Sequence, residues 1–133
     1  MRAFLAFCLA PYLAVSLAAP AAAQPRVPEA KEAFEARQRD LVTLASHLGA
    51  LHRLRQVCFV EQNPDLFRLR MMTLVPLEMP VGATRLDMIS AFNAGYRGAS
   101  SMHAICGREA RAAYAQEAER ALVVTERLYA PFR

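Results

Sequence analysis

The stretch LVTLASHLGALHRLRQVC, residues 41–58, decides the fold class of this 133-residue chain. Leucines recur along it at steps of three and four residues, which places them on one face of a helix: Leu41, Leu44, Leu48 and Leu51. Phe34 extends this stripe toward the N-terminus, and no Gly or Pro occurs between Glu29 and Gly49. We therefore predict a first helix from about residue 29 to about residue 60, in which Gly49 is tolerated where another helix crosses closely.

Start and stop signals predict a second helix directly afterwards. Asn63, Pro64 and Asp65 supply an N-cap, a proline for the first helical position and an acid for the first turn. Pro76 should end this helix near Leu74, because proline disfavours helix in the residue before it. Residues 76–82 then form a connector.

Two more helices complete the predicted fold. The third begins at Thr84 and is followed by a short helical piece that reaches Cys106. Its apolar face comprises Leu86, Ile89, Phe92 and Tyr96. The last helix runs from about Arg108 to about Tyr129, with a stripe that comprises Ala110, Tyr114, Ala118, Ala121, Thr125 and Leu128. Because no strand-like alternation occurs, the predicted fold class is all-α, an antiparallel bundle of about four helices.

The N-terminus has the layout of a secretory signal peptide. A positive start at Arg2 precedes an apolar stretch over residues 3–17, and small residues in an A-x-A pattern follow up to Ala23. We predict cleavage after Ala23, although an uncleaved anchor is the alternative. The predicted division is a signal peptide at 1–23, a flexible lead-in at 24–28 and a single helical domain at 29–133. The cleaved protein is expected in the periplasm without stable membrane insertion.

Export leaves two cysteines, Cys58 and Cys106, and an even number in an oxidising compartment predicts one disulfide. Two free thiols are the alternative. The formal net charge is +4, and the basic residues are interleaved with acids rather than clustered. Binding to nucleic acid requires a clustered basic face, so we expect no nucleic-acid partner.

Two polar residues fall inside the predicted apolar stripes, Arg55 on the first helix and Asn93 on the third. Because a buried charge without a partner is costly, we predict a polar cluster of Arg55 and Asn93 with Glu117 or Glu78. The alternative is that Arg55 reaches solvent along its aliphatic stem. The predicted contact surface comprises Tyr96, Arg97 and the connector at residues 76–82.

No complete catalytic or metal-ligating set is evident, so we expect no catalytic residues, no metal and no cofactor. His47 and His52 are five residues apart and diverge around a helix. Methionines at helical spacing are usually core residues rather than copper ligands. Pairing of Cys58 with Cys106 would also remove a thiol nucleophile.

Three features together carry a resemblance: LGALHRLRQVC at Leu48–Cys58, AFNAGYRG at Ala91–Gly98, and Cys106. They resemble an uncharacterised family of small exported alphaproteobacterial proteins, a domain of unknown function. The resemblance implies export and two matched cysteines, and it implies no activity.

Two functional hypotheses follow from these observations. The first is a non-enzymatic envelope protein that binds another protein or a cell-wall component. The second is an unrecognised enzyme or small-ligand carrier that uses the polar cluster around Arg55 and Asn93. An open concavity that contains Arg55, Asn93 and a carboxylate would favour the second hypothesis.

Overall fold

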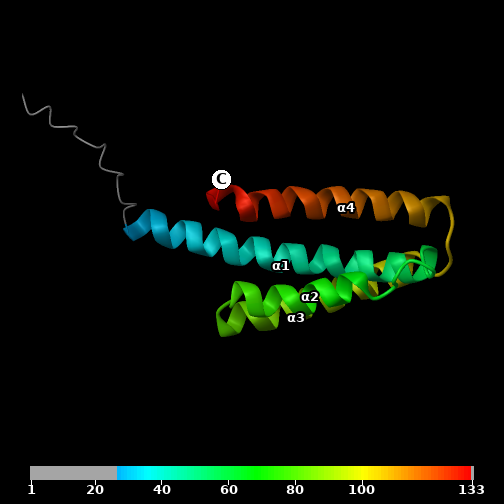
Figure 1. The fold of residues 1–133 in the computed structure, drawn as a ribbon, viewed down its shortest axis with the longest axis horizontal. Coiled ribbons are helices and arrows are strands. Elements are labelled where there is room, and N and C mark those ends of the chain that lie inside the picture. The colour runs from blue at the N-terminus through cyan, green and yellow to red at the C-terminus, as the bar shows by residue number, and fades with distance from the viewer. Residues whose placement is uncertain (1–26, 133) are drawn as a thin grey trace, which may run out of the picture.

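A computed structural model describes residues 27–132, which form four α-helices and a terminal 3-10 turn without a strand (Figure 1). The elements are α1 (Val27–Cys58), α2 (Leu66–Glu78), α3 (Gly82–Met102), α4 (Arg108–Tyr129) and η1 (Ala130–Phe132). The predicted all-α class is therefore confirmed. The predicted signal peptide lies outside the described residues.

Helix α1 is the centre of the bundle, and α2, α3 and α4 each pack against it. Consecutive helices run in opposite directions (Figure 1). The α2–α3 turn and the end of α4 therefore lie at the end of the bundle where α1 begins. The α1–α2 and α3–α4 connections lie together at the opposite end.

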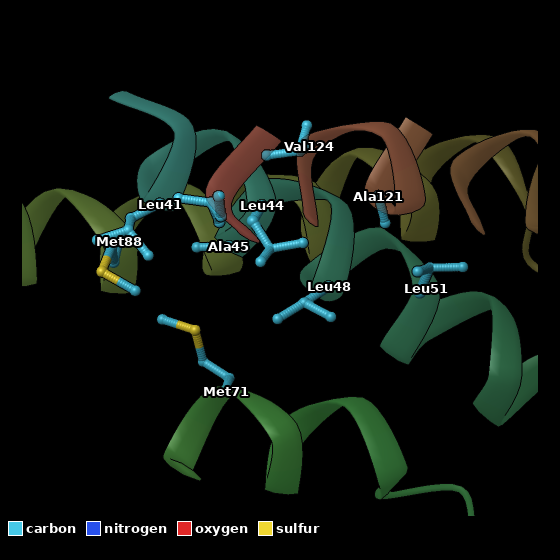
Figure 2. Close-up of a cluster of buried hydrophobic side chains, with 10 residues drawn as sticks. Leu41, Leu44, Ala45, Leu48, Leu51, Met71, Met88, Ala121 and Val124 are labelled. Carbon is cyan, nitrogen blue, oxygen red and sulfur yellow. The ribbon is translucent and has the colours of Figure 1, made fainter. Parts of the chain in front are cut away.

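The leucine stripe of α1 forms the core as predicted, and its four leucines are buried (Figure 2). Met71 of α2, Met88 of α3 and Val124 of α4 meet this stripe from three sides. The predicted extension of the stripe to Phe34 is wrong, because this ring is 50% exposed. The core is therefore confined to the part of α1 that the other helices cover.

Two glycines let α1 and α3 touch backbone to backbone. A Cβ atom on Gly49 would overlap the Phe92 carbonyl of α3, and one on Gly95 would overlap the Ser46 carbonyl of α1. Only a residue without a side chain allows such an approach. The expected close crossing at Gly49 is confirmed, and α3 is the helix that crosses there.

Helix α2 differs from its prediction at both ends. It begins at Leu66, and Asn63 adopts a left-handed conformation (φ 52°) instead of capping the helix. Pro76 lies inside the helix, which continues to Glu78, so the predicted end near Leu74 is wrong. A proline this near the end removes one helical N–H bond, to the carbonyl of Met72, and this residue is open to water.

Helix α3 buries a different face from the predicted one. It begins at Gly82, and Thr84, predicted as its first residue, is buried within it along with Met88 and Ala99. Leu86 and Ile89 are 69% and 46% exposed, so the predicted apolar face is wrong for these two residues. Phe92 and Tyr96 of that face are partly buried, and Phe92 packs against the core. The close contact with α1 requires a small residue of α3 at the crossing, and Gly95 supplies it. Leu86 and Ile89 lie on a different side of α3 from this contact.

The C-terminal part of the chain follows the prediction more closely. Helix α4 runs from Arg108 to Tyr129 as expected, and Ala110, Ala121 and Leu128 of its stripe are buried. The helical piece predicted before Cys106 does not form, because α3 ends at Met102 and residues 103–107 are not helical.

Candidate functional site

The two cysteines meet at the end of the bundle that holds both long connections. Cys58 is the last residue of α1, and Cys106 lies in the α3–α4 connection. Their Sγ atoms are 2.15 Å apart and their Cα atoms 4.9 Å apart, so the structure pairs them in a disulfide as predicted. This link holds the start of α4 and the end of α3 against α1.

Arg55 is used to hold the α1–α2 connection. Its Nε donates to the carbonyls of Gln62 and Asn63 at 2.9 Å, and its Nη1 donates to the Tyr114 hydroxyl at 3.2 Å. Its guanidinium also lies 5.9 Å from the ring centre of Phe67. Arg55 therefore holds the turn after α1 through its carbonyls, of which that of Asn63 also accepts from the Leu66 N–H at 3.2 Å.

The structure does not bring Arg55, Asn93, Glu78 and Glu117 together. Asn93 is exposed, since α3 turns its small-residue face to α1. Glu78 pairs with Arg37, and Glu117 pairs with other residues of α1 and α4. Each carboxylate thus has a nearer basic partner than Arg55.

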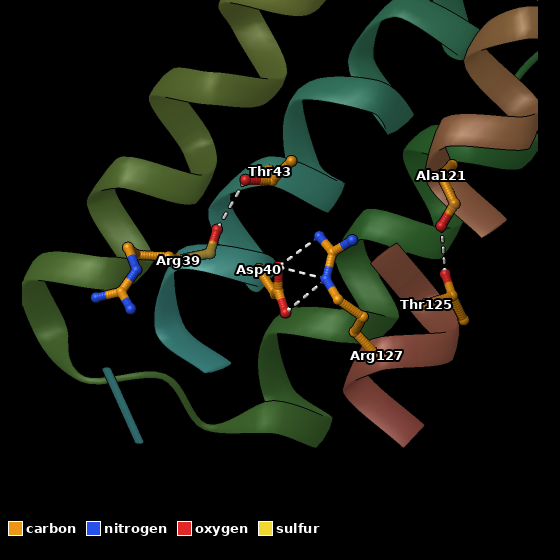
Figure 3. Close-up of polar contacts among 6 residues, drawn as sticks. All are labelled: Arg39, Asp40, Thr43, Ala121, Thr125 and Arg127. Atoms are coloured by element: carbon orange, nitrogen blue, oxygen red, sulfur yellow. Dashed lines mark hydrogen bonds and ion pairs between the residues drawn. The ribbon is translucent and has the colours of Figure 1, made fainter. Parts of the chain in front are cut away.

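Charged residues close the interface between α1 and α4. The His47 Nδ1 lies 2.6 Å from Glu117, whose other oxygen accepts from Arg120 at 2.7 Å. Nearer the end of α4, Arg127 donates from two nitrogens to the Asp40 carboxylate, with a shortest distance of 2.7 Å (Figure 3). The Asp40 hydrogen bond raises the pKa of Arg127 above its usual value.

The His47–Glu117 pair resembles part of a catalytic dyad, but it is surface-exposed on one side and has no nucleophile bonded to it in residues 27–132. A general base needs a reacting group within hydrogen-bond reach. The same part of the chain contains no cluster of three or more His, Cys, Asp or Glu residues that could hold a metal ion.

A buried polar chain around His52 was not predicted from the sequence. The His52 Nδ1 lies 3.2 Å from the Pro64 carbonyl, and its Nε2 lies 3.3 Å from the Gln56 amide nitrogen. The Tyr96 hydroxyl donates to the Gln56 carbonyl oxygen at 3.0 Å. This arrangement fits a neutral ring that donates from Nδ1 and accepts at Nε2.

Burial lowers the pKa of His52, and the Pro64 carbonyl and Asp65 oppose this effect. The ring also packs beside Phe92 and Tyr96. The Tyr96 hydroxyl is therefore committed to an internal bond, whereas Arg97, the other residue of the predicted contact surface, is exposed. Nothing in the sequence around His52 indicated that its ring would link α1 to the α1–α2 connection and to α3.

An open apolar groove of about 660 Å³ lies between α2 and α3, and we call it the α2–α3 groove. Its lining includes Met71, Met72, Val75, Met79, Arg85 and Ile89, with Pro76 and Pro80 toward the turn. Arg85 is the one charged residue in this lining. Part of the predicted connector at residues 76–82 therefore belongs to a larger surface that the sequence did not show.

Large apolar side chains are exposed on both helices that form the α2–α3 groove. Those in the lining of the groove are Met72, Met79 and Ile89. Exposed apolar side chains gathered in one region mark interaction sites more often than isolated ones do. The groove is therefore the candidate functional site.

These features define a small helical protein with one disulfide, internally paired polar groups and an uncovered apolar groove. The family described as protein of unknown function (DUF2385) matches residues 37–132, and the chain belongs to this family. The expectation of an uncharacterised family is thereby confirmed. No curated protein and no solved structure matches the chain.

The match begins within α1 and ends in η1, so it includes the leucine stripe, both cysteines and the groove. Among residues 27–132, no helix has the length and apolar character needed to cross a membrane.

Proposed function

We propose that this protein is a non-enzymatic binding protein of the bacterial envelope, exported to the periplasm, and that it binds a partner in the α2–α3 groove. The uncovered groove supports this proposal most strongly. Exposed apolar surface costs about 25 cal/mol per Å² relative to burial, so a partner that covers it gains free energy. The signal-peptide pattern at residues 1–23 supports the location.

A protein fits the groove better than a cell-wall component does. Sugar polymers present many hydroxyl groups, which need hydrogen-bonding partners when they are buried. The groove lining offers thioether and aliphatic groups and a single guanidinium. An apolar protein segment would bury this surface without leaving polar groups unsatisfied.

The alternative of an enzyme or small-ligand carrier around Arg55 and Asn93 has less support. Arg55 is committed to backbone carbonyls and Tyr114, while Asn93 is exposed on α3. The α2–α3 groove has no carboxylate in its lining, so it offers no acid–base pair for catalysis.

Site-specific photocrosslinking in cells tests where the protein binds. A photoreactive amino acid at Met72 or Ile89 should give a discrete crosslinked adduct. The same group at Leu122 on α4 is the matched control, since this residue is also apolar and exposed but far from the groove. Equal crosslinking at all three positions would contradict the proposal.

Intact-mass measurement on the periplasmic fraction tests the location. We expect a chain that lacks residues 1–23 and is two hydrogen atoms lighter than its dithiol form. Recovery of the full-length chain in the membrane fraction would contradict cleavage and free export.

A further inference from the structure

We propose that the α2–α3 groove receives an amphipathic helix of a partner protein whose apolar stripe is flanked by acidic side chains. This inference rests on the proposed function and names the kind of partner. The shape of the groove, the chemistry of its lining and the charge of its rim each support it.

The shape of the groove suits a helical segment. It runs between α2 and α3, which are antiparallel neighbours in sequence joined by the turn at residues 79–81 (Figure 1). Its volume of about 660 Å³ is large enough for several apolar side chains. A helix that presents residues at positions i, i+3, i+4 and i+7 would place such side chains in one row.

The lining is rich in methionine, with Met71 and Met72 contributed by α2 and Met79 by the turn that follows it. Methionine is flexible and polarisable, so methionine-lined grooves adapt to the side chains of bound helices. A lipid surface is less well matched. Aromatic side chains anchor proteins at bilayer interfaces, and none lines this groove.

The rim of the groove is basic. Arg85 lines it at the start of α3. Arg68 lies four residues before Met72 and seven before Val75, so it shares their face of α2 near the other end of the groove. Arg85 therefore lies in the lining itself, and helical spacing places Arg68 beyond the lining on the same face of α2.

The lining of the groove contains no acidic residue. Glu78 of α2 pairs with Arg37 on the side that faces α1 and α4. Asp87 of α3 faces a different depression, which Gln38 and Arg39 line from α1. A second copy of the chain would place like charges against each other, so the charges favour an acidic partner instead.

Met79 provides an independent indication that this surface has a role. It ends α2 with a left-handed backbone (φ 40°, ψ 52°), at a position where glycine is the usual residue. Its side chain is 82% exposed, so core packing does not explain its presence. A strained residue with an exposed apolar side chain is typical of a functional surface.

Charge-matched peptides test the inference. Two synthetic amphipathic helices of about 18 residues share one leucine stripe, and the stripe is flanked by Glu in one and by Lys in the other. We expect the full chain to bind the Glu peptide about tenfold more tightly, as several exposed charge pairs would give. The double variant Arg68→Glu/Arg85→Glu should reverse this preference.

Two variants with the same chemical change show whether the peptide enters the groove. Ile89→Glu should abolish binding of both peptides, whereas Leu122→Glu should bind like the unchanged chain. Far-ultraviolet circular dichroism of each variant checks that the helices are intact. Fluorescence anisotropy at several salt concentrations gives the affinity and its charge dependence.

Four results would overturn the inference: equal affinity for the two peptides, binding of neither, binding of phosphatidylglycerol vesicles in place of peptide, or a self-association that Ile89→Glu removes. The crosslinking experiment separates these failures from failure of the proposed function. If Met72 and Ile89 still crosslink in cells while neither peptide binds, the groove remains a binding site and only the partner class is wrong.

Discussion

Helices α2 and α3 both pack against α1, but they make different kinds of contact. Helix α3 touches α1 through backbone atoms at Gly49 and Gly95. Helix α2 contacts the same helix through a layer of side chains, and Met71 is its one buried residue. The α3 contact is therefore close and inflexible in geometry, whereas the α2 contact is looser.

This difference explains the origin of the α2–α3 groove. Because small residues of α3 face α1, the larger Leu86 and Ile89 are turned away from the core. Helix α2 leaves both of them exposed, and open depressions lie on both of its sides. The same face of α3 that packs closely on α1 thus leaves the opposite side of α3 exposed, where Ile89 lines the groove.

The largest expected effect comes from removing the disulfide at the end of α3. The bond joins residues 48 positions apart, and the chain-entropy relation gives about 4 kcal/mol of stabilisation for such a loop. Replacing Cys58 and Cys106 together by Ser should lower the free energy of unfolding by about this amount. Urea titration of the variant, with the reduced unchanged chain as a control, measures it. Equal midpoints for all forms would refute a stabilising bond.

The next largest effect should come from the glycine contact itself. Gly49→Ala must move α1 and α3 apart and should cost about 3 kcal/mol. Gly98→Ala is the matched control, because a Cβ atom there meets nothing within 4 Å. In the helix α3 this control should stabilise the protein by up to about 1 kcal/mol. If both substitutions had the same effect, the backbone contact would not be what distinguishes α3 from α2.

A smaller, pH-dependent effect on the free energy of unfolding should come from His52, which holds the chain just before α2. Burial lowers the pKa of His52 in the folded chain below its ordinary value of 6.5. As the pH falls, His52 is therefore protonated in the unfolded chain before it is protonated in the folded chain, which favours unfolding. The contribution of neutral His52 is complete above pH 6.5 and decreases below it. Urea titrations at several pH values between about 7.5 and 5.5 should show a steeper loss of stability for the unchanged chain than for His52→Gln. Parallel curves would contradict this.

The smallest expected effect concerns Met79. Met79→Gly relieves the left-handed backbone and should raise the free energy of unfolding by about 0.5 kcal/mol, after the entropy cost of glycine in the unfolded chain. The same variant should bind the Glu peptide more weakly, since it removes an exposed side chain of the groove. Thermal unfolding and anisotropy on one sample measure both. A destabilised variant with unchanged binding would show that Met79 serves the fold.

The polar residues of the candidate site were the least predictable part of the chain. Placing Arg55 and Asn93 in apolar stripes assumed that each helix buries its large apolar residues. This assumption holds for the leucine stripe of α1, where Leu41 and Leu51 are buried, and fails for Leu86 and Ile89 of α3. Arg55 lies near the end of α1, where its guanidinium donates to backbone carbonyls of the following turn.

The sequence by itself determined the four helices, the leucine stripe of α1, the bounds of α4 and the pairing of Cys58 with Cys106. These features depend on local periodicity, capping and cysteine count, which can be read without knowing any neighbour. Only the tertiary structure decided which face of α3 is buried, how far α2 continues past Pro76 and where the groove lies. The buried face of α3 depends on the distance between two helices, which Gly49 and Gly95 set jointly from different segments. The continuation of α2 depends on Pro76 lying near its end, where one missing N–H bond leaves an exposed residue.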